Sequence, residues 1–219
     1  MKKSTLLLNN INLRPFQIHK FRGFVGNLFI EHDLIHNHDE KGKPIYRYPL
    51  IQFKLIDKTP AIIAITDRAV SIFAELFMKL DKVKIEGTLI PVFEKDLKVE
   101  EVEFGYSNEI FMYEYVSPWI GLNQKNFTKY NNAGNDEKNQ MLKKVMTGNI
   151  LSMAKHLDCW LSQDQKIKID HKLKKIKVNL KGKSMTAFKG IFKTNFLIPD
   201  YLGIGKSVSR GFGVVKRVI

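Results

Sequence analysis

Apolar and polar residues recur with strand-like and helix-like periods through the first 92 residues. Alternation predicts half-buried strands, and apolar residues three or four apart predict one buried helix face. The predicted elements are a strand at 6–13, a helix at 15–30, strands at 46–56 and 61–65, a helix at 67–80 and a strand at 83–92. This β-α-β-β-α-β order is the ferredoxin-like arrangement, in which a four-stranded antiparallel sheet carries two helices on one face.

The second half of the chain repeats this pattern less regularly. A helix is predicted to begin at Asn135, with an apolar face that extends from Met141 to Leu161, and a polar loop at 123–135 precedes it. Strands are predicted at 97–104, 110–116, 165–170, 174–180, 186–194 and 211–218. We therefore predict an α+β protein of two tandem ferredoxin-like domains with antiparallel sheets, at residues 1–100 and 101–219.

Positive charge is concentrated at the end of the chain. The 219 residues contain 36 Lys and Arg against 22 Asp and Glu, a net charge of +14. Residues 164–219 contribute +11 of this excess, with 14 basic residues and three acidic ones. Such a region favours a polyanionic partner, although lysine-rich surfaces also serve solubility. The basic residues alternate with apolar ones as in strands, which argues against a basic membrane-surface helix.

Composition narrows the class of protein further. Cys159 is the only cysteine, which excludes a disulfide scaffold, and its setting on the predicted helix indicates a structural role. No apolar run approaches the roughly 20 residues that span a bilayer, and the first residues lack the apolar region of a signal peptide. We expect a soluble cytoplasmic protein without a membrane partner.

Glycines and basic residues alternate in the segment 201–213. The residues are Gly203, Gly205, Gly211 and Gly213, with Lys206 and Arg210 between them. Glycine-rich backbone can bring N–H groups and cations close to phosphates. A P-loop would need glycine where Asp200 stands, and the dinucleotide fingerprint would need it where Val208 stands. The alternative to phosphate binding is a glycine turn before the last strand.

A predicted loop before the 46–56 strand gathers groups that can transfer protons. His36, His38, Lys41, Lys43 and Tyr46 lie within 11 residues. Histidine suits general acid–base work near neutral pH, and tyrosine or lysine can orient groups or stabilise an oxyanion. Each histidine could instead be an ordinary surface residue.

These two blocks together resemble a known superfamily. The pattern Gly-x-Gly-x5-Gly-Phe-Gly at 203–213, followed by a final strand, resembles the RAMP superfamily. The block from His36 to Lys54, with Tyr-Arg-Tyr-Pro at 46–49, is similar to the CRISPR-associated endoribonuclease six family. The resemblance spans essentially the whole chain. It implies metal-independent, cofactor-free cleavage of CRISPR repeat RNA, giving a 2′,3′-cyclic phosphate and a 5′-hydroxyl in antiviral defence.

The resemblance also implies site residues. His38 is the favoured catalytic histidine, with His36 close behind it. Tyr46 is the candidate tyrosine, although Tyr48 alternates with it and is either a second candidate or a core aromatic. Lys43 is the candidate lysine, with Lys41 as the alternative. The RNA-binding candidates are Lys41, Arg47, Lys172, Lys174, Lys189, Lys193, Gly203, Gly205, Lys206, Ser209 and Arg210.

Two other functions remain open at this stage. One is a non-catalytic RNA-binding subunit of a CRISPR effector complex on the same fold. The other is a metal-dependent hydrolase built on His32, His36 and His38, with Asp39 and Glu40 nearby, but no third ligand has clear spacing. The expected partner is single-stranded or weakly structured repeat RNA. Effector-complex subunits and a second copy of the chain are further candidate partners.

Overall fold

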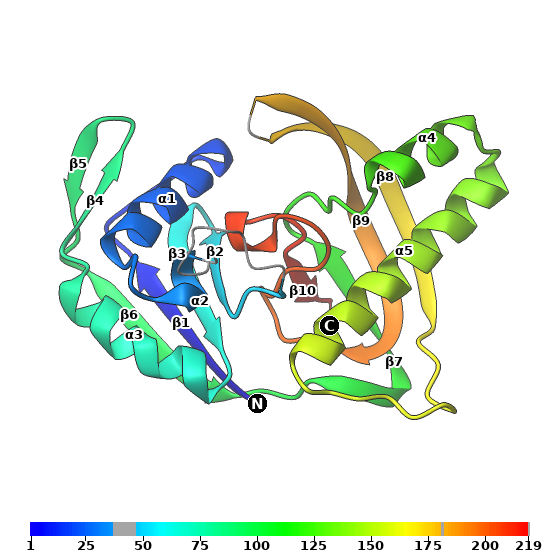
Figure 1. Ribbon diagram of the computed structural model, residues 1–219, viewed down its shortest axis with the longest axis horizontal. Coiled ribbons are helices and arrows are strands. Elements are labelled where there is room, and N and C mark those ends of the chain that lie inside the picture. Colours follow the sequence, from blue (N-terminus) through cyan, green and yellow to red (C-terminus); the bar gives the residue numbers. More distant parts are fainter. Residues whose placement is uncertain (37–46, 181, 219) are drawn as a thin grey trace. The chain divides into compact units, whose positions relative to one another are not determined.

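The chain divides into two units in the computed structural model, which describes residues 1–36, 47–180 and 182–218 (Figure 1). Unit 1 consists of Met1–Val102 together with Val208–Gly211. Unit 2 consists of Glu103–Ser207 together with Phe212–Ile219. A short segment near the end of the chain therefore belongs with the first unit, whereas the sequence analysis places every residue beyond 100 in the second domain.

Unit 1 is built on a four-stranded antiparallel sheet with the order β2-β3-β1-β6. The elements are β1 (Lys2–Leu8), a 3-10 turn η1 (Pro15–Gln17), α1 (Ile18–Leu28), α2 (Asp33–His36), β2 (Ile51–Ile56), β3 (Thr59–Ile65), α3 (Asp67–Lys79), β4 (Lys82–Ile85), β5 (Thr88–Pro91) and β6 (Lys95–Glu101). Ignoring the short elements, the order β1-α1-β2-β3-α3-β6 is the predicted ferredoxin-like arrangement.

The fourth strand of this sheet is not the predicted one. Residues 83–92 form a separate hairpin of β4 and β5, and β6 pairs with β1 instead (Figure 1). Glu86 and Gly87 have φ of 54° and 88°, the left-handed conformation that reverses a chain in a tight hairpin. This two-residue turn divides the apolar run that the alternation pattern presents as one strand.

The core of unit 1 lies between the sheet and its helices. Alternate residues of β1 and β2, including Leu6, Leu8 and Phe53, are fully buried in one apolar cluster with Phe21 of α1 and Phe73 of α3. The rings of Phe21 and Phe53 meet edge to face at 5.5 Å. Lys54 follows Phe53 in β2, so its side chain leaves the opposite face of the strand.

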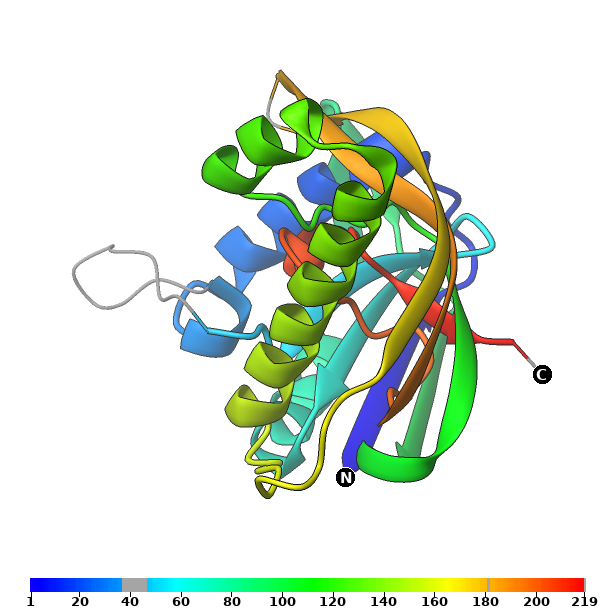
Figure 2. The ribbon, with the colours of Figure 1, turned by 90° about the vertical axis from the view of Figure 1, so that its right-hand side faces the viewer.

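Unit 2 contains a second antiparallel sheet with the order β10-β7-β9-β8. Its elements are β7 (Gly105–Tyr115), α4 (Gln124–Asn132), α5 (Asn135–His156), β8 (Ile169–Leu180), β9 (Lys183–Leu197) and β10 (Val215–Arg217). Figure 2 shows α4 and α5 on the same side of the β8–β9 hairpin. The order of strands along the sheet is that of unit 1, but no α-helix connects β9 to β10. The glycine-rich segment occupies that place in the chain.

Several predicted boundaries in unit 2 were wrong. The polar stretch predicted as a loop contains α4, because the Asn123 side chain accepts a hydrogen bond from the Asn126 N–H at 2.7 Å and caps the helix. Helix α5 ends at His156, before the predicted apolar face does. Strands were predicted at 165–170 and 174–180, whereas a single strand, β8, begins only at Ile169 and continues without a break to Leu180.

Within the described parts of the chain, no helix combines the length and the apolar character needed to cross a membrane. This finding agrees with the absence of a long apolar run in the sequence.

Candidate functional site

The histidine block falls mostly outside the described residues. His36 is the last residue of α2, whereas His38, Lys41, Lys43 and Tyr46 lie in the stretch 37–46 that the structure does not describe. The chain is described again from Arg47. The assignment of these residues to catalysis therefore stays a prediction from the sequence.

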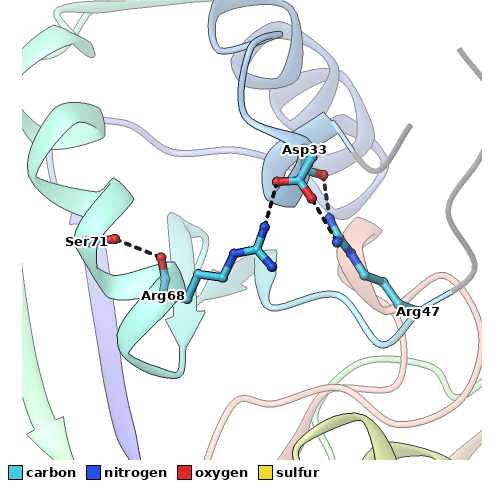
Figure 3. A network of polar contacts seen from close by, with 4 residues as sticks. All are labelled: Asp33, Arg47, Arg68 and Ser71. Carbon is cyan, nitrogen blue, oxygen red and sulfur yellow. Dashed lines mark hydrogen bonds and ion pairs between the residues drawn. The ribbon is translucent and has the colours of Figure 1, made fainter. Parts of the chain in front are cut away.

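Arg47 is held by an aspartate that precedes the histidine block (Figure 3). Its Nη1 donates to Asp33 Oδ2 at 2.9 Å, and its Nη2 donates to the backbone oxygen of Asp33 at 2.8 Å. Arg68 of α3 adds a longer contact to Asp33 Oδ1 at 3.4 Å. Charge-assisted bonds of this forked kind are among the stronger ones in proteins. Arg47 thus joins the chain on both sides of the histidine block, and its predicted contact with RNA remains untested.

Tyr48 is buried, with 9% of its surface exposed. Strand β2 begins at Ile51 rather than at residue 46, so Tyr48 lies before the strand. The expectation that Tyr46 and Tyr48 alternate within one strand is therefore wrong. The burial of Tyr48 agrees with the core-aromatic alternative.

A histidine and two glutamates lie close together beside α3. The ligand atoms of Glu31, His32 and Glu75 lie within 4.8 Å of one another, and His32 Nε2 is 2.7 Å from Glu75 Oε2. The ammonium of Lys79 also binds Glu75, and its hydrogen bond, followed by that of His32, lowers the pKa of the Glu75 carboxyl. These contacts form an ion-pair network in which Lys79 already compensates Glu75. The side chain of His36 lies outside the part of the chain that the structure describes.

Two glycines of the C-terminal segment allow close backbone packing in unit 2. Gly205 has φ of 93°, and a Cβ there would lie 2.6 Å from Trp119 Nε1. Gly213 has φ of 64°, and a Cβ there would lie 2.0 Å from the backbone oxygen of Ile204. Both positions require glycine for conformation and for space. The turn interpretation thus explains Gly205 and Gly213 structurally, and contacts of Gly203, Gly205 and Lys206 with RNA stay predictions.

The middle of the same segment belongs to unit 1, where a buried lysine binds it. Residues Val208–Arg210 form the 3-10 turn η2, which contains the predicted RNA-binding residues Ser209 and Arg210. Lys54 of β2 has no exposed surface, and its Nζ donates a hydrogen bond to the Val208 oxygen at 2.9 Å. Burial lowers the pKa of Lys54 well below its usual range. The sequence analysis assigned no role to Lys54. Its position among the apolar residues of a predicted strand could have indicated a buried lysine with a structural or functional role.

The four lysines predicted on the C-terminal strands share one sheet face in unit 2. Lys174 lies directly opposite Lys189, Lys172 is opposite Ile191, and Lys193 is opposite Asp170. Residues that are opposite or two apart point to the same side of a sheet. All four lysines are exposed, and none of them forms an ion pair with a described residue. We call Lys172, Lys174, Lys189 and Lys193 the lysine face.

The opposite side of this sheet is covered by the helices. Phe188 of β9 is buried, and its ring meets the ring of Tyr130 of α4 edge to face at 5.6 Å. The lysine face therefore lies on the side that α4 does not cover. Lys216 of β10 joins it, because its partner Glu114 in β7 is opposite Ile191. Sequence reasoning missed Lys216, since strand pairing alone reveals this position.

The fold places the chain in the class of proteins with two tandem ferredoxin-like units. Two tandem ferredoxin-like units are the arrangement of structures described as "An RAMP protein binding different RNA substrates" and "Csf5, CRISPR-Cas type IV Cas6 crRNA endonuclease", with TM-scores of 0.59 and 0.62. At 14% and 11% identity, these likenesses show the fold alone. The family profiles are more specific, with the Cas6b N-terminal domain matching residues 1–103 and the Cas6b C-terminal domain matching residues 105–218. The chain belongs to the Cas6b family.

Solved structures and a relative agree with this assignment. A "Crystal structure of Cas6b" has a TM-score of 0.93 and 34% identity, with 99% of each chain covered. A second, "Crystal structure of CRISPR RNA processing endoribonuclease Cas6b", has a TM-score of 0.80 and 33% identity over the whole of both chains. "Uncharacterized protein MJ0978" of Methanocaldococcus jannaschii is 38% identical over 144 residues, which is 66% of this chain and 97% of that protein. The predicted family and fold class are confirmed.

Proposed function

We propose that this protein is a metal-independent endoribonuclease that cleaves CRISPR repeat RNA to produce mature guide RNA. The observation that carries the proposal is the match of both units to Cas6b domains. A solved protein with which the whole chain aligns is described as a CRISPR RNA processing endoribonuclease. The proposal includes a cytoplasmic location, a single-stranded or weakly structured repeat as substrate, and effector-complex subunits or a second copy of the chain as partners.

The proposed reaction uses the nucleophile that RNA itself carries. A general base takes the proton of the 2′-hydroxyl next to the scissile phosphate, and the 2′-oxygen forms a bond to phosphorus. The bond from phosphorus to the 5′-oxygen breaks, and a general acid protonates that oxygen. The products are a 2′,3′-cyclic phosphate and a 5′-hydroxyl. We assign His38, or His36, to proton transfer, Tyr46 to orientation, and Lys43 to stabilising the negative phosphorane.

Cleavage of repeat RNA in the presence of EDTA tests this mechanism. The purified protein is expected to cut a labelled repeat at one site, leaving a 5′ product with a cyclic phosphate. A single 2′-deoxynucleotide immediately upstream of that site should abolish cleavage, because it removes the nucleophile. Mass spectrometry of the products, and gel analysis of the deoxy substrate, give the two measurements.

The other outcomes distinguish the alternatives. Cleavage of the deoxy substrate would show that the 2′-hydroxyl is not the nucleophile. Activity that EDTA removes and a divalent cation restores would support a metal-dependent nuclease. Specific binding of the repeat without cleavage, with or without metal, would leave the non-catalytic RNA-binding subunit as the function.

The lysine face is expected to hold the RNA backbone and to make binding depend on salt. Each phosphate contact with single-stranded RNA contributes about 0.7 to the slope of log affinity against log salt concentration. The double variant Lys174→Ala/Lys189→Ala should therefore reduce the magnitude of that slope by about 1.4. Filter binding of the repeat at several salt concentrations measures the slope.

A matched control changes the same charge elsewhere on unit 2. Lys144 of α5 is exposed, and Lys177 of β8 projects from the sheet face opposite to the lysine face. The double variant Lys144→Ala/Lys177→Ala should keep the wild-type slope. Equal slopes for the two double variants would show that net charge, rather than the lysine face, determines RNA binding.

A further inference from the structure

The turn η2 is fixed firmly on unit 1. The buried Lys54 Nζ donates a hydrogen bond to the Val208 oxygen at 2.9 Å. On the other side of the turn, Gly211 has φ of 84°, and a Cβ there would lie 3.2 Å from Cγ2 of Ile18 in α1. The turn is therefore seated against both β2 and α1, and it ends with Arg210 next to this close contact.

Arg22 lies on α1 one helical turn after Ile18, on the same side of the helix. Its Nε is buried and has no hydrogen-bond partner among the described residues. Burial lowers the pKa of the Arg22 guanidinium, and the positive charge of Arg210 lowers it further. Burial also lowers the pKa of Arg210. Helix α1 contains no acidic residue that could compensate them.

Two partly buried guanidinium groups that form no ion pair with a carboxylate of the described residues are an unfavourable arrangement. Removing a charge from water costs free energy unless a counter-charge replaces the water. The guanidinium fork matches the oxygens of a phosphate, and two forks can hold one phosphate from two sides. A bound anion would supply the missing counter-charge.

We propose that Arg22 and Arg210 form a binding site for one phosphate group of the RNA backbone, and that Lys54 positions Arg210 by holding the η2 turn. This inference rests on the proposed function for the identity of the substrate as RNA. It adds Arg22, which the sequence pattern did not identify, to the residues that bind it.

Salt-dependent binding of repeat RNA to an Arg22→Met variant tests the site. Methionine keeps the apolar stem of the side chain and removes the charge. The slope of log affinity against log salt concentration should decrease in magnitude by about 0.7, the contribution of one phosphate contact. Lys20→Ala is the matched control, because Lys20 lies on the same helix and its Nζ is paired with Glu86 at 2.6 Å. That control should retain the wild-type slope, and thermal unfolding verifies that both variants are folded.

Single methylphosphonate substitutions identify the phosphate. A neutral methylphosphonate at the bound position should weaken binding to the wild-type protein, and this loss of affinity should be smaller for the Arg22→Met variant. Arg210→Met should show the same reduced sensitivity at the same position. An unchanged slope for Arg22→Met would overturn the site. So would a reduced sensitivity to methylphosphonate that falls at different RNA positions in the two variants. Failure of the wild-type protein to bind repeat RNA at all would instead refute the proposed function.

Discussion

Replacing His38 with alanine is expected to slow cleavage of the repeat RNA by about 10²–10⁴-fold. General acid–base catalysis by a positioned side chain contributes a factor of this size, and alanine cannot transfer the proton. The affinity for RNA should be unaffected, because the histidine stabilises the transition state and does not bind the RNA backbone. Single-turnover rates at saturating protein concentration measure the chemical step, and filter binding measures the affinity.

His156→Ala provides the control for this experiment. His156 is exposed at the end of α5 in unit 2, and its Nδ1 lies 2.7 Å from the Ser152 oxygen of the same helix. That variant should cleave at the wild-type rate. Full activity of His38→Ala together with inactivity of His36→Ala would transfer the catalytic role to His36. Full activity of both would exclude the histidine block from the chemistry.

Gly213→Ala is expected to destabilise the protein by roughly 2–5 kcal/mol, the range of backbone strain combined with a steric conflict. The left-handed φ of 64° disfavours any side chain, and the added Cβ would meet the Ile204 oxygen at 2.0 Å. The backbone cannot withdraw easily, because the Ile204 N–H donates to the Gly213 oxygen at 2.9 Å. Chemical denaturation followed by circular dichroism measures the change.

Gly182→Ala separates strain from steric conflict. Gly182 has a similar φ of 76°, but nothing lies within 4 Å of the position of an added Cβ. Its replacement should therefore cost only the strain, about 1 kcal/mol. Equal losses for the two variants would show that Gly213 is required for its conformation alone, and that the close packing of the glycine-rich segment contributes little.

The hydrophobic pattern predicted most elements of unit 1, since most of its strands and helices bury one face. It failed at residues 83–92, because the reversal depends on the conformation of Glu86 and Gly87 rather than on apolar spacing. It also missed α4, where mostly polar residues form a helix capped by Asn123. In both cases a local turn or cap, rather than burial, determined the structure.

For the candidate site as well, the sequence predicted one part, and only the tertiary structure showed the other. The alternation of lysine and apolar residues in β8 and β9 predicted an exposed basic strand pair. Only the register of the hairpin placed Lys174 opposite Lys189 and brought Lys216 of the last strand onto the same face. The roles of His36, His38, Tyr46 and Lys43 still rest on the sequence, because most of that block lies outside the described residues.

The sequence by itself determined the α+β class, the two ferredoxin-like units, the Cas6-type resemblance and the concentration of charge near the end of the chain. These properties follow from local periodicity, composition and short motifs. Only the tertiary structure decided that residues 208–211 belong with unit 1, where Lys54 binds Val208 across 154 positions of sequence and Gly211 packs closely against Ile18. Such contacts depend on which buried polar groups can satisfy one another in space, and no pattern within a single segment contains that information.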